Sequence, residues 1–254
     1  MSESAGSEGG VKELPTFLDI LNVNQDYEIF GLTVHELVPA IMSLIIIAFL
    51  TILSIVATRK LKKVPTGVQA FLEIVVDGLH SFVKSQMGKA GTRFLPLVGT
   101  LFLYILLMNL IGQVPLFHSP TNNLNTTVAL ALIVFFVTQY CGLKECGIGG
   151  YFKHMMGEPK WMAPMMFPLH LMAEFFTKPM SLSMRLFGNI MGEDTVLAIF
   201  VGFSPLLFGL IPIPMQFPMV LLGVFASTIQ AGIFALLTCF YIGSAMGLHA
   251  EEEH

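Results

Sequence analysis

Long runs of apolar residues constrain this fold more than any other feature of the sequence. The first run, Leu37 to Ala57, is long enough to cross a hydrocarbon layer as a helix, which needs about 20 residues. Further apolar runs cover about residues 94–111, 127–141, 162–203 and 220–245. Charged residues make up only 12% of the chain, about half of the share in a typical soluble domain. The sequence therefore predicts an all-α, polytopic membrane protein with a single domain over residues 1–254.

The positive residues between these runs predict the orientation of the chain. A basic cluster at residues 59–63 follows the first run, residues 112–125 contain no Lys or Arg, and residues 144–160 contain three Lys. Because basic loops stay on the cytoplasmic side, we expect residues 112–125 and the N-terminal segment 1–30 to lie outside. The basic cluster, a loop over residues 144–160 and the acidic tail 247–254 would then be cytoplasmic. Counted in this way, the chain makes five transmembrane crossings.

The segment after the first basic cluster has a different pattern. Residues 68–83 place Glu73, Asp77 and His80 among apolar side chains at helical spacing. A helix with a polar side and an apolar side lies at the membrane surface more readily than across it. We therefore expect an amphipathic interfacial helix here.

The run over residues 162–203 is too long for one upright span. As a helix it would be roughly 60 Å long at about 1.5 Å per residue, twice the ~30 Å thickness of the hydrocarbon layer. It must either break, with Pro168, Pro179 and Gly188 as candidate kinks, or lie strongly tilted in the membrane. The sequence leaves both alternatives open.

A permanent charge lies inside this long run. Of the 13 Lys and Arg residues, only Lys178 and Arg185 interrupt long hydrophobic sequence. A guanidinium costs roughly 2.5–3.5 kcal/mol at the centre of a membrane helix on insertion scales, because it loses its water. Contact with a lipid headgroup is the alternative explanation, but residues 196–203 continue apolar beyond the arginine. The charge therefore predicts a functional site.

Other polar residues share one side of the predicted helix with the arginine. At about 100° per residue, Glu174, Lys178, Ser181, Arg185 and Asn189 fall within an arc of about 80°. Glu174 and Lys178 at i,i+4 could simply form a structural ion pair. Arg185 has no acid at i±3 or i±4, so its counter-charge must come from elsewhere.

Three further polar residues complete the set of candidates. Glu193 and Asp194 project from other sides of the same helix, and they mark either a second wet region or the outer water interface. Gln230 lies in the last apolar run beside Ser227 and Thr228. It could join neighbouring helices by a hydrogen bond or contact the arginine, and sequence spacing leaves both open.

No pattern for catalysis or metal binding is found. Cys141, Cys146 and Cys239 lack CxxC spacing, and we expect them to be small buried hydrophobic residues. The glycine-rich stretch 147–150 lacks the Lys-Ser/Thr of a nucleotide-binding loop. We therefore expect a chain with no cofactor, no metal ion, no nucleic-acid partner and no enzymatic activity of its own.

Residues 181–189 (Ser-Leu-Ser-Met-Arg-Leu-Phe-Gly-Asn), preceded by Thr177-Lys178-Pro179, closely resemble the signature of the subunit a family of F-type ATP synthases. The resemblance covers about residues 28–247 and agrees with the five-crossing topology. It extends to Met108-Asn109-Leu110 with Pro115, to Asn125-Thr126-Thr127-Val128-Ala129-Leu130, and to Thr228-Ile229-Gln230-Ala231-Gly232-Ile233-Phe234 followed by Tyr241-Ile242-Gly243.

This resemblance implies a membrane stator. In that family, subunit a packs against a rotating ring of small helical hairpin subunits, each with a carboxylate at mid-membrane, and offers two offset half-channels for protons or sodium ions. By position, Arg185 matches the family's essential arginine, which would attract each ionised ring carboxylate and block a direct leak. The family also implies a peripheral-stalk subunit, a bacterial inner membrane and ATP synthesis on separate subunits.

The resemblance also implies roles for the other candidates. Asn189, Asp194 and Gln230 would line or support the outer path, together with Glu193 beside them. The inner path would be lined by Glu174, Lys178 and Ser181. The position nine after the arginine is often Glu in the family, and here it is Asp194, so either acid can serve the outer path. Gly223 stands where certain members have His or Glu.

Two other functions fit the same sequence. One is a structural membrane scaffold that anchors partner helices, with Arg185 in a static ion pair. The other is a self-contained transporter, but the sequence has no internal repeat with paired broken helices. Loss of assembly in an Arg185→Ala variant would indicate the scaffold, and activity of the purified chain alone would indicate the transporter.

Overall fold

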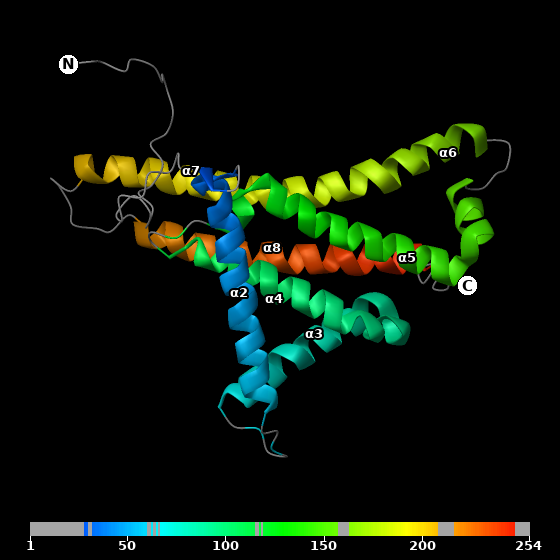
Figure 1. Ribbon diagram of the computed structural model, residues 1–254, viewed down its shortest axis with the longest axis horizontal. Coiled ribbons are helices and arrows are strands. Elements are labelled where there is room, and N and C mark those ends of the chain that lie inside the picture. The colour runs from blue at the N-terminus through cyan, green and yellow to red at the C-terminus, as the bar shows by residue number, and fades with distance from the viewer. Residues whose placement is uncertain are drawn as a thin grey trace.

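The computed structural model is helical apart from one very short hairpin (Figure 1). It describes residues 28–29, 32–59, 62, 65, 67–114, 117, 119–156, 163–207 and 216–246. The helices are α2 (Val34–Thr58), α3 (Val68–Gly91), α4 (Leu95–Ile111), α5 (Leu124–Met156), α6 (Ala163–Met172), α7 (Lys178–Leu207) and α8 (Gln216–Ala245). Most of the predicted external segment and the whole acidic tail lie outside the described residues.

A short hairpin that the sequence did not predict precedes α2. Strands β1 (Glu28–Ile29) and β2 (Leu32–Thr33) pair antiparallel just before α2. Each strand has only two residues, so neither shows the alternation of apolar and polar residues by which a strand is predicted.

Four described helical segments are long and apolar enough to cross a membrane. They are Leu37–Thr58, Val68–Ile111, Leu124–Glu145 and Phe217–Ala245. These segments confirm the predicted helices at 37–57, 94–111, 127–141 and 220–245. The predicted run at 162–203 is not among them.

The long run nevertheless stays helical throughout its described part. Helix α6, a π-helical turn at Ala173–Thr177 and α7 follow one another without a gap. The π turn lies directly before Pro179, which has no backbone N–H and crowds the carbonyl four residues earlier, so a wider turn is favoured there. Pro168 and Gly188 were the other candidate kinks, and both lie inside helices. The run bends at one point but does not break.

The direction of this long helix differs from that of the first helix. In Figure 1, α2 runs vertically, whereas α7 and α8 run close to horizontal and one above the other. Contacts between α7 and α8 and between α5 and α7 hold this layer together. If α2 crosses a bilayer upright, α7 and α8 must therefore lie strongly tilted.

The prediction of a loop over residues 144–160 is wrong for its described part. Helix α5 continues to Met156, and residues 157–160 lie outside the described residues. The helical geometry is interrupted at Gly147, whose φ of 66° is favourable only for glycine. The glycines made a loop seem more favourable than a helix, whereas the structure confines the irregularity to one residue.

The helices share a buried core beside the polar stripe. Its fully buried members include Ile105 of α4, Val134 of α5, Leu186 of α7 and Phe234 of α8. The buried residues of helix α3 lie at intervals of four from Leu79 to Gly91, which is the single buried face expected of an amphipathic helix. Two of them, Val83 and Met87, belong to a second buried cluster that also includes Cys239 of α8.

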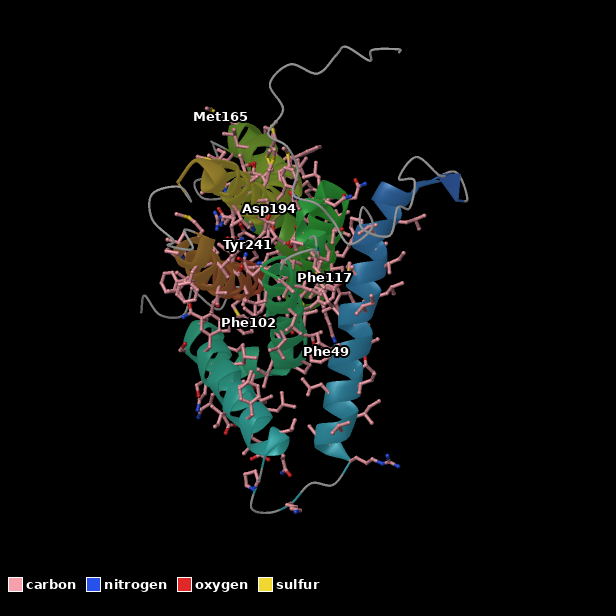
Figure 2. All side chains as sticks on the ribbon, turned by 90° about the vertical axis from the view of Figure 1, so that its left-hand side faces the viewer. Phe49, Phe102, Phe117, Met165, Asp194 and Tyr241 are labelled. Atoms are coloured by element: carbon pink, nitrogen blue, oxygen red, sulfur yellow. The ribbon has the colours of Figure 1, made fainter. Side chains whose placement is uncertain are left out.

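The outer surface is rich in large apolar side chains. Ile52 of α2, Phe71 of α3 and Phe136 of α5 are each more than 60% exposed. Figure 2 shows side chains standing out from α2 along the whole helix, on the side that faces away from the other helices. Exposed apolar surface of this extent is typical of a protein that contacts lipid or partner helices.

Candidate functional site

Arg185 lies on an exposed side of α7. The adjacent side of the helix is buried through Leu182 and Leu186, which are 2% and 0% exposed. Around the arginine, Met184 and Met191 are more than half exposed, and Gly188 has open space beside it. The helix therefore buries its apolar side in the core and leaves the guanidinium outside.

Arg185 forms no ion pair within the part of the chain that the structure describes. The two ion pairs there join Arg93 to Glu145 and Lys178 to Glu174. This agrees with the prediction that the counter-charge comes from elsewhere. The static ion pair required by the scaffold alternative is not found among the described residues.

The acid and the base at the start of α7 neutralise one another. Lys178 Nζ lies 2.5 Å from Glu174 Oε2, and their side chains are 25% and 18% exposed. Lys178 Nζ also lies 5.3 Å from the centre of the Tyr241 ring, which is within the range of a cation–π interaction. The ion pair that the i,i+4 spacing left open is therefore present. Ser181 lies half-buried one turn further on.

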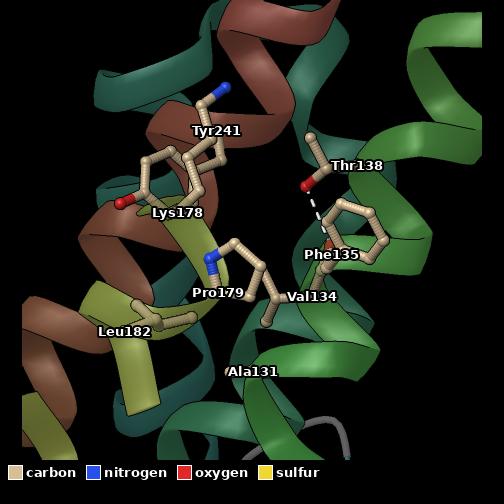
Figure 3. Close-up of a pocket in the computed structure, with 8 residues that line it drawn as sticks. All are labelled: Ala131, Val134, Phe135, Thr138, Lys178, Pro179, Leu182 and Tyr241. Atoms are coloured by element: carbon tan, nitrogen blue, oxygen red, sulfur yellow. Dashed lines mark hydrogen bonds between the residues drawn. The ribbon is translucent and has the colours of Figure 1, made fainter. Parts of the chain in front are cut away.

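A small pocket lies beside this ion pair (Figure 3). Its volume is about 10 Å³, which is close to the minimum for one water molecule. In Figure 3, Lys178 and Tyr241 lie on one side of the pocket, and Phe135 and Thr138 of α5 lie on the other. The pocket is lined by Ala131, Val134, Phe135, Thr138, Lys178, Pro179, Leu182 and Tyr241.

One turn beyond the arginine, a hydrogen bond joins α7 to α8. Asn189 Nδ2 donates to Gln230 Oε1 at 2.5 Å. Gln230 is only 2% exposed, whereas Asn189 is exposed. Of the two alternatives for Gln230, the structure therefore supports the bond between helices.

The two acids of α7 are held by amide side chains from another part of the chain. Gln113 Nε2 donates to Glu193 Oε1, and Asn122 Nδ2 donates to Asp194 Oδ2 at 2.8 Å. All four side chains are half-buried. Both acids therefore face the connection between α4 and α5, not Arg185.

Gln113 and Asn122 were not predicted as site residues. Gln113 follows α4 directly, and Asn122 ends the short 3₁₀ helix Pro120–Asn122 that precedes α5. Both lie in the segment 112–125, which the absence of Lys and Arg placed outside the membrane. The sequence signal that could have identified them is their polar character in a segment that joins two apolar runs.

A buried network fixes this connection against α4. Ser119 Oγ donates to the carbonyl oxygen of Met108 at 3.0 Å and lies 2.6 Å from Thr121 Oγ1. Thr121 Oγ1 in turn donates to Asn109 Oδ1 at 2.8 Å. Asn109 and Thr121 are fully buried. The segment that presents the two amides is therefore anchored in the core.

Gly223 of α8 leaves room for the first acid. A Cβ atom placed there would lie 2.0 Å from Glu193 Oε1 and 2.4 Å from Gln113 Oε1. A glycine is therefore required for this arrangement, because any side chain would have to displace the carboxylate or the amide. The carboxylate of Glu193 and the amide of Gln113 thus occupy the space beside Gly223.

The described residues contain no candidate metal site. No group of three His, Cys, Asp or Glu side chains there could hold a metal ion. Cys141 and Cys239 are free and buried, as predicted, and the side chain of Cys146 lies outside the described set.

Comparisons with known proteins identify the family. The sequence matches the family model described as "ATP synthase A chain" over residues 40–243. It is 44% identical over 209 residues to the ATP synthase subunit a of Trichlorobacter lovleyi. The aligned region covers 82% of this chain and 85% of that protein. Over 210 residues, the identity is 44% to the subunit a of Geobacter sulfurreducens and 46% to that of Geotalea uraniireducens, each over 83% of this chain and 86% of the relative. The chain therefore belongs to the ATP synthase A chain family.

Proposed function

We propose that this chain is the ion-translocating stator subunit of a rotary F-type ATP synthase, with Arg185 at the centre of its ion path. It is a non-catalytic membrane subunit, and the nucleotide chemistry takes place on other subunits. One observation carries the assignment of the site: Arg185 lies in the family's signature, faces outward and forms no ion pair within the described chain.

The physical chemistry of the guanidinium suits this role. Arginine keeps its proton under all physiological conditions, whereas a desolvated lysine can lose it. A fixed positive charge on the outer face of α7 attracts a carboxylate of the ring once that carboxylate has given up its ion. The same charge repels cations, so it opposes a direct leak from one half-channel to the other.

Two half-channels would meet the ring on either side of the arginine. Asn189, Glu193, Asp194 and Gln230 form the outer path. Glu174, Lys178 and Ser181 form the inner path. An ion enters by one path, rides on a ring carboxylate and leaves by the other. The acids on one side of Arg185 and the ion pair on the other support this division.

The same proposal sets the topology. The chain makes five crossings of a bacterial inner membrane, the strongly tilted α7 being one of them, with the N-terminus outside and the C-terminus in the cytoplasm. Helix α3 lies at the interface. The basic cluster after α2 and the absence of Lys and Arg from residues 112–125 support this orientation.

The partners follow from this arrangement. The ring of carboxylate-bearing hairpins packs against the outward face of α7 and α8, where Met184 and Phe225 are more than half exposed. A peripheral-stalk subunit binds elsewhere on the apolar outer surface, and lipid covers the rest. The transported ion is a proton or a sodium ion.

ATP-driven ion pumping by the whole complex in inverted vesicles tests the proposal. An Arg185→Ala complex, compared with the native complex at matched assembly, should lose pumping. Arg93→Ala is the matched control, because Arg93 is an arginine already paired with an acid, and this variant should pump normally. Undiminished pumping by the Arg185→Ala complex would contradict the proposal, and loss of assembly would indicate the scaffold alternative.

A further inference from the structure

The connection between α4 and α5 presents two neutral amides to two neighbouring acids. We propose that Gln113 and Asn122 are positioning residues of the outer ion path, each of which holds one carboxylate of α7 in place. This inference rests on the proposed function, because it needs Glu193 and Asp194 to lie on that path. The hydrogen bonds of Gln113 to Glu193 and of Asn122 to Asp194 carry it.

Two separate donors are needed because the acids are adjacent in sequence. Neighbouring residues on a helix project about 100° apart, so a single donor cannot hold both carboxylates. Gln113 reaches the first acid from the turn after α4, and Asn122 reaches the second from the 3₁₀ helix before α5. The two contacts join segments that are 80 and 72 residues apart in the sequence.

The chemistry of an amide suits a carboxylate that must exchange ions. A lysine or arginine in the same place would neutralise the carboxylate and compete with the transported cation. An amide N–H orients one carboxylate oxygen and leaves the net charge unchanged. The two hydrogen bonds engage Oε1 of Glu193 and Oδ2 of Asp194.

Three parts of the chain fix the position of the Glu193 side chain: α7 itself, the turn after α4 and α8. Its carboxylate and the Gln113 amide lie together over Gly223 of α8, where a Cβ atom would clash with both. The amides themselves cannot drift, since Ser119 and Thr121 anchor their segment to α4 through buried hydrogen bonds. Such support on rigid elements is what a precisely placed polar group requires.

Passive ion flux through the membrane sector, with the catalytic heads removed from the vesicles, tests this inference. Gln113→Met and Asn122→Leu keep the approximate size of each side chain and remove its donor. At matched assembly, each should lower the flux roughly three- to tenfold, the scale of one typical net hydrogen bond. Gln69→Met is the matched control, since Gln69 donates to the exposed Glu73 at 2.9 Å on α3, away from the path. It should leave the flux unchanged.

Double variants separate positioning from simple packing. If Gln113 acts through Glu193, Gln113→Met should cause no further loss of flux in a Glu193→Gln background. Asn122→Leu should likewise cause none in an Asp194→Asn background. The acids are replaced singly, so that the other carboxylate maintains a measurable flux. Losses that multiply in the double variants would overturn the inference.

The same set of variants distinguishes failure of the inference from failure of the function on which it rests. If the acid variants reduce the flux and the amide variants do not, the outer path stands and the positioning role is wrong. If neither acid variant reduces the flux, the outer path itself is misassigned and the inference falls with it.

Discussion

The acids before and after Arg185 are held in different ways. Before the arginine, Glu174 is paired with Lys178 at 2.5 Å, so the two charges cancel. After it, Glu193 and Asp194 have no cation partner among the described residues and are held by neutral amides. Arg185 lies between the two sets of acids and forms no ion pair in the described chain.

The charges of Glu174 and Lys178 neutralise one another, whereas those of Glu193 and Asp194 remain free to bind a cation. A neutral pair can be replaced as a unit with little electrostatic consequence, because no charge is left behind. An acid that is hydrogen-bonded only to a neutral amide keeps its negative charge, so it can bind an ion that passes to or from a ring carboxylate. The second arrangement is stable only where water or another subunit reaches it, which the half-buried positions of both acids allow.

The largest expected effect comes from comparing two double variants, one that removes the charges after Arg185 and one that removes the charges before it. Glu193→Gln with Asp194→Asn should lower passive ion flux at least about tenfold, since one lost charge–charge or charged hydrogen-bond interaction is worth about that factor. Glu174→Gln with Lys178→Met should also lower it, since the pair lies on the proposed inner path, but by a smaller factor, because the pair is neutral as a whole. Equal losses from both double variants would break the comparison.

An intermediate effect is expected at the glycine beside the first acid. Gly223→Ala should lower passive flux several-fold, because its Cβ atom would lie 2.0 Å from Glu193 Oε1. Gly232→Ala on the same helix is the control, since nothing lies within 4 Å of its Cβ position. The prediction fails if the two variants conduct alike at matched assembly.

A smaller effect, on stability, is expected from breaking the inner ion pair. Lys178→Met should lower the free energy of unfolding by about 1–3 kcal/mol, since it leaves Glu174 half-buried without a partner. Replacing both residues, as Glu174→Leu with Lys178→Met, should recover most of that loss. Thermal unfolding of the complex in detergent measures both, and a double variant less stable than the single one would contradict the prediction.

The smallest effect is expected at the exposed ion pair of Arg93 and Glu145. Their side chains are 51% and 40% exposed, and such pairs contribute about 0–1 kcal/mol because water screens them. Glu145→Gln should therefore lower the free energy of unfolding of the complex by no more than about 1 kcal/mol and should leave the ion flux unchanged. A clear loss of flux would place this pair on the inner path.

The sequence predicted the helices well because their signal is local. Length and hydropathy are enough to identify a run such as Leu37–Thr58 or Phe217–Ala245. The ion pair of Glu174 and Lys178 could be named as a possibility for the same reason, since i,i+4 spacing brings the two side chains together. The motif around Arg185 identified the family before any geometry was known.

The sequence could not predict what depends on contacts between distant segments. Gln113 and Asn122 reach acids 80 and 72 residues away, and no spacing rule links such positions. The partner of Gln230 stayed open for the same reason, because Asn189 lies 41 residues away on another helix.

The π turn was a different kind of omission. The calculated arc of about 80° for the polar stripe assumed about 100° per residue along the whole run, and this does not hold across Ala173–Thr177. The turn follows from Pro179, but a proline in a sequence predicts a distortion without saying which form it takes.

The central claim is that the fixed charge of Arg185 separates the two ion paths. Passive ion flux through vesicles without catalytic heads tests this most directly, when the native and Arg185→Ala sectors are compared before and after carbodiimide modification of the ring carboxylates. In the native sector the modification should stop the flux, since every ion must ride on the ring. In the Arg185→Ala sector a flux insensitive to the modification should remain, because ions can then cross directly between the paths. If the modification stops all flux in the Arg185→Ala sector as well, Arg185 does not separate the paths and the account is contradicted.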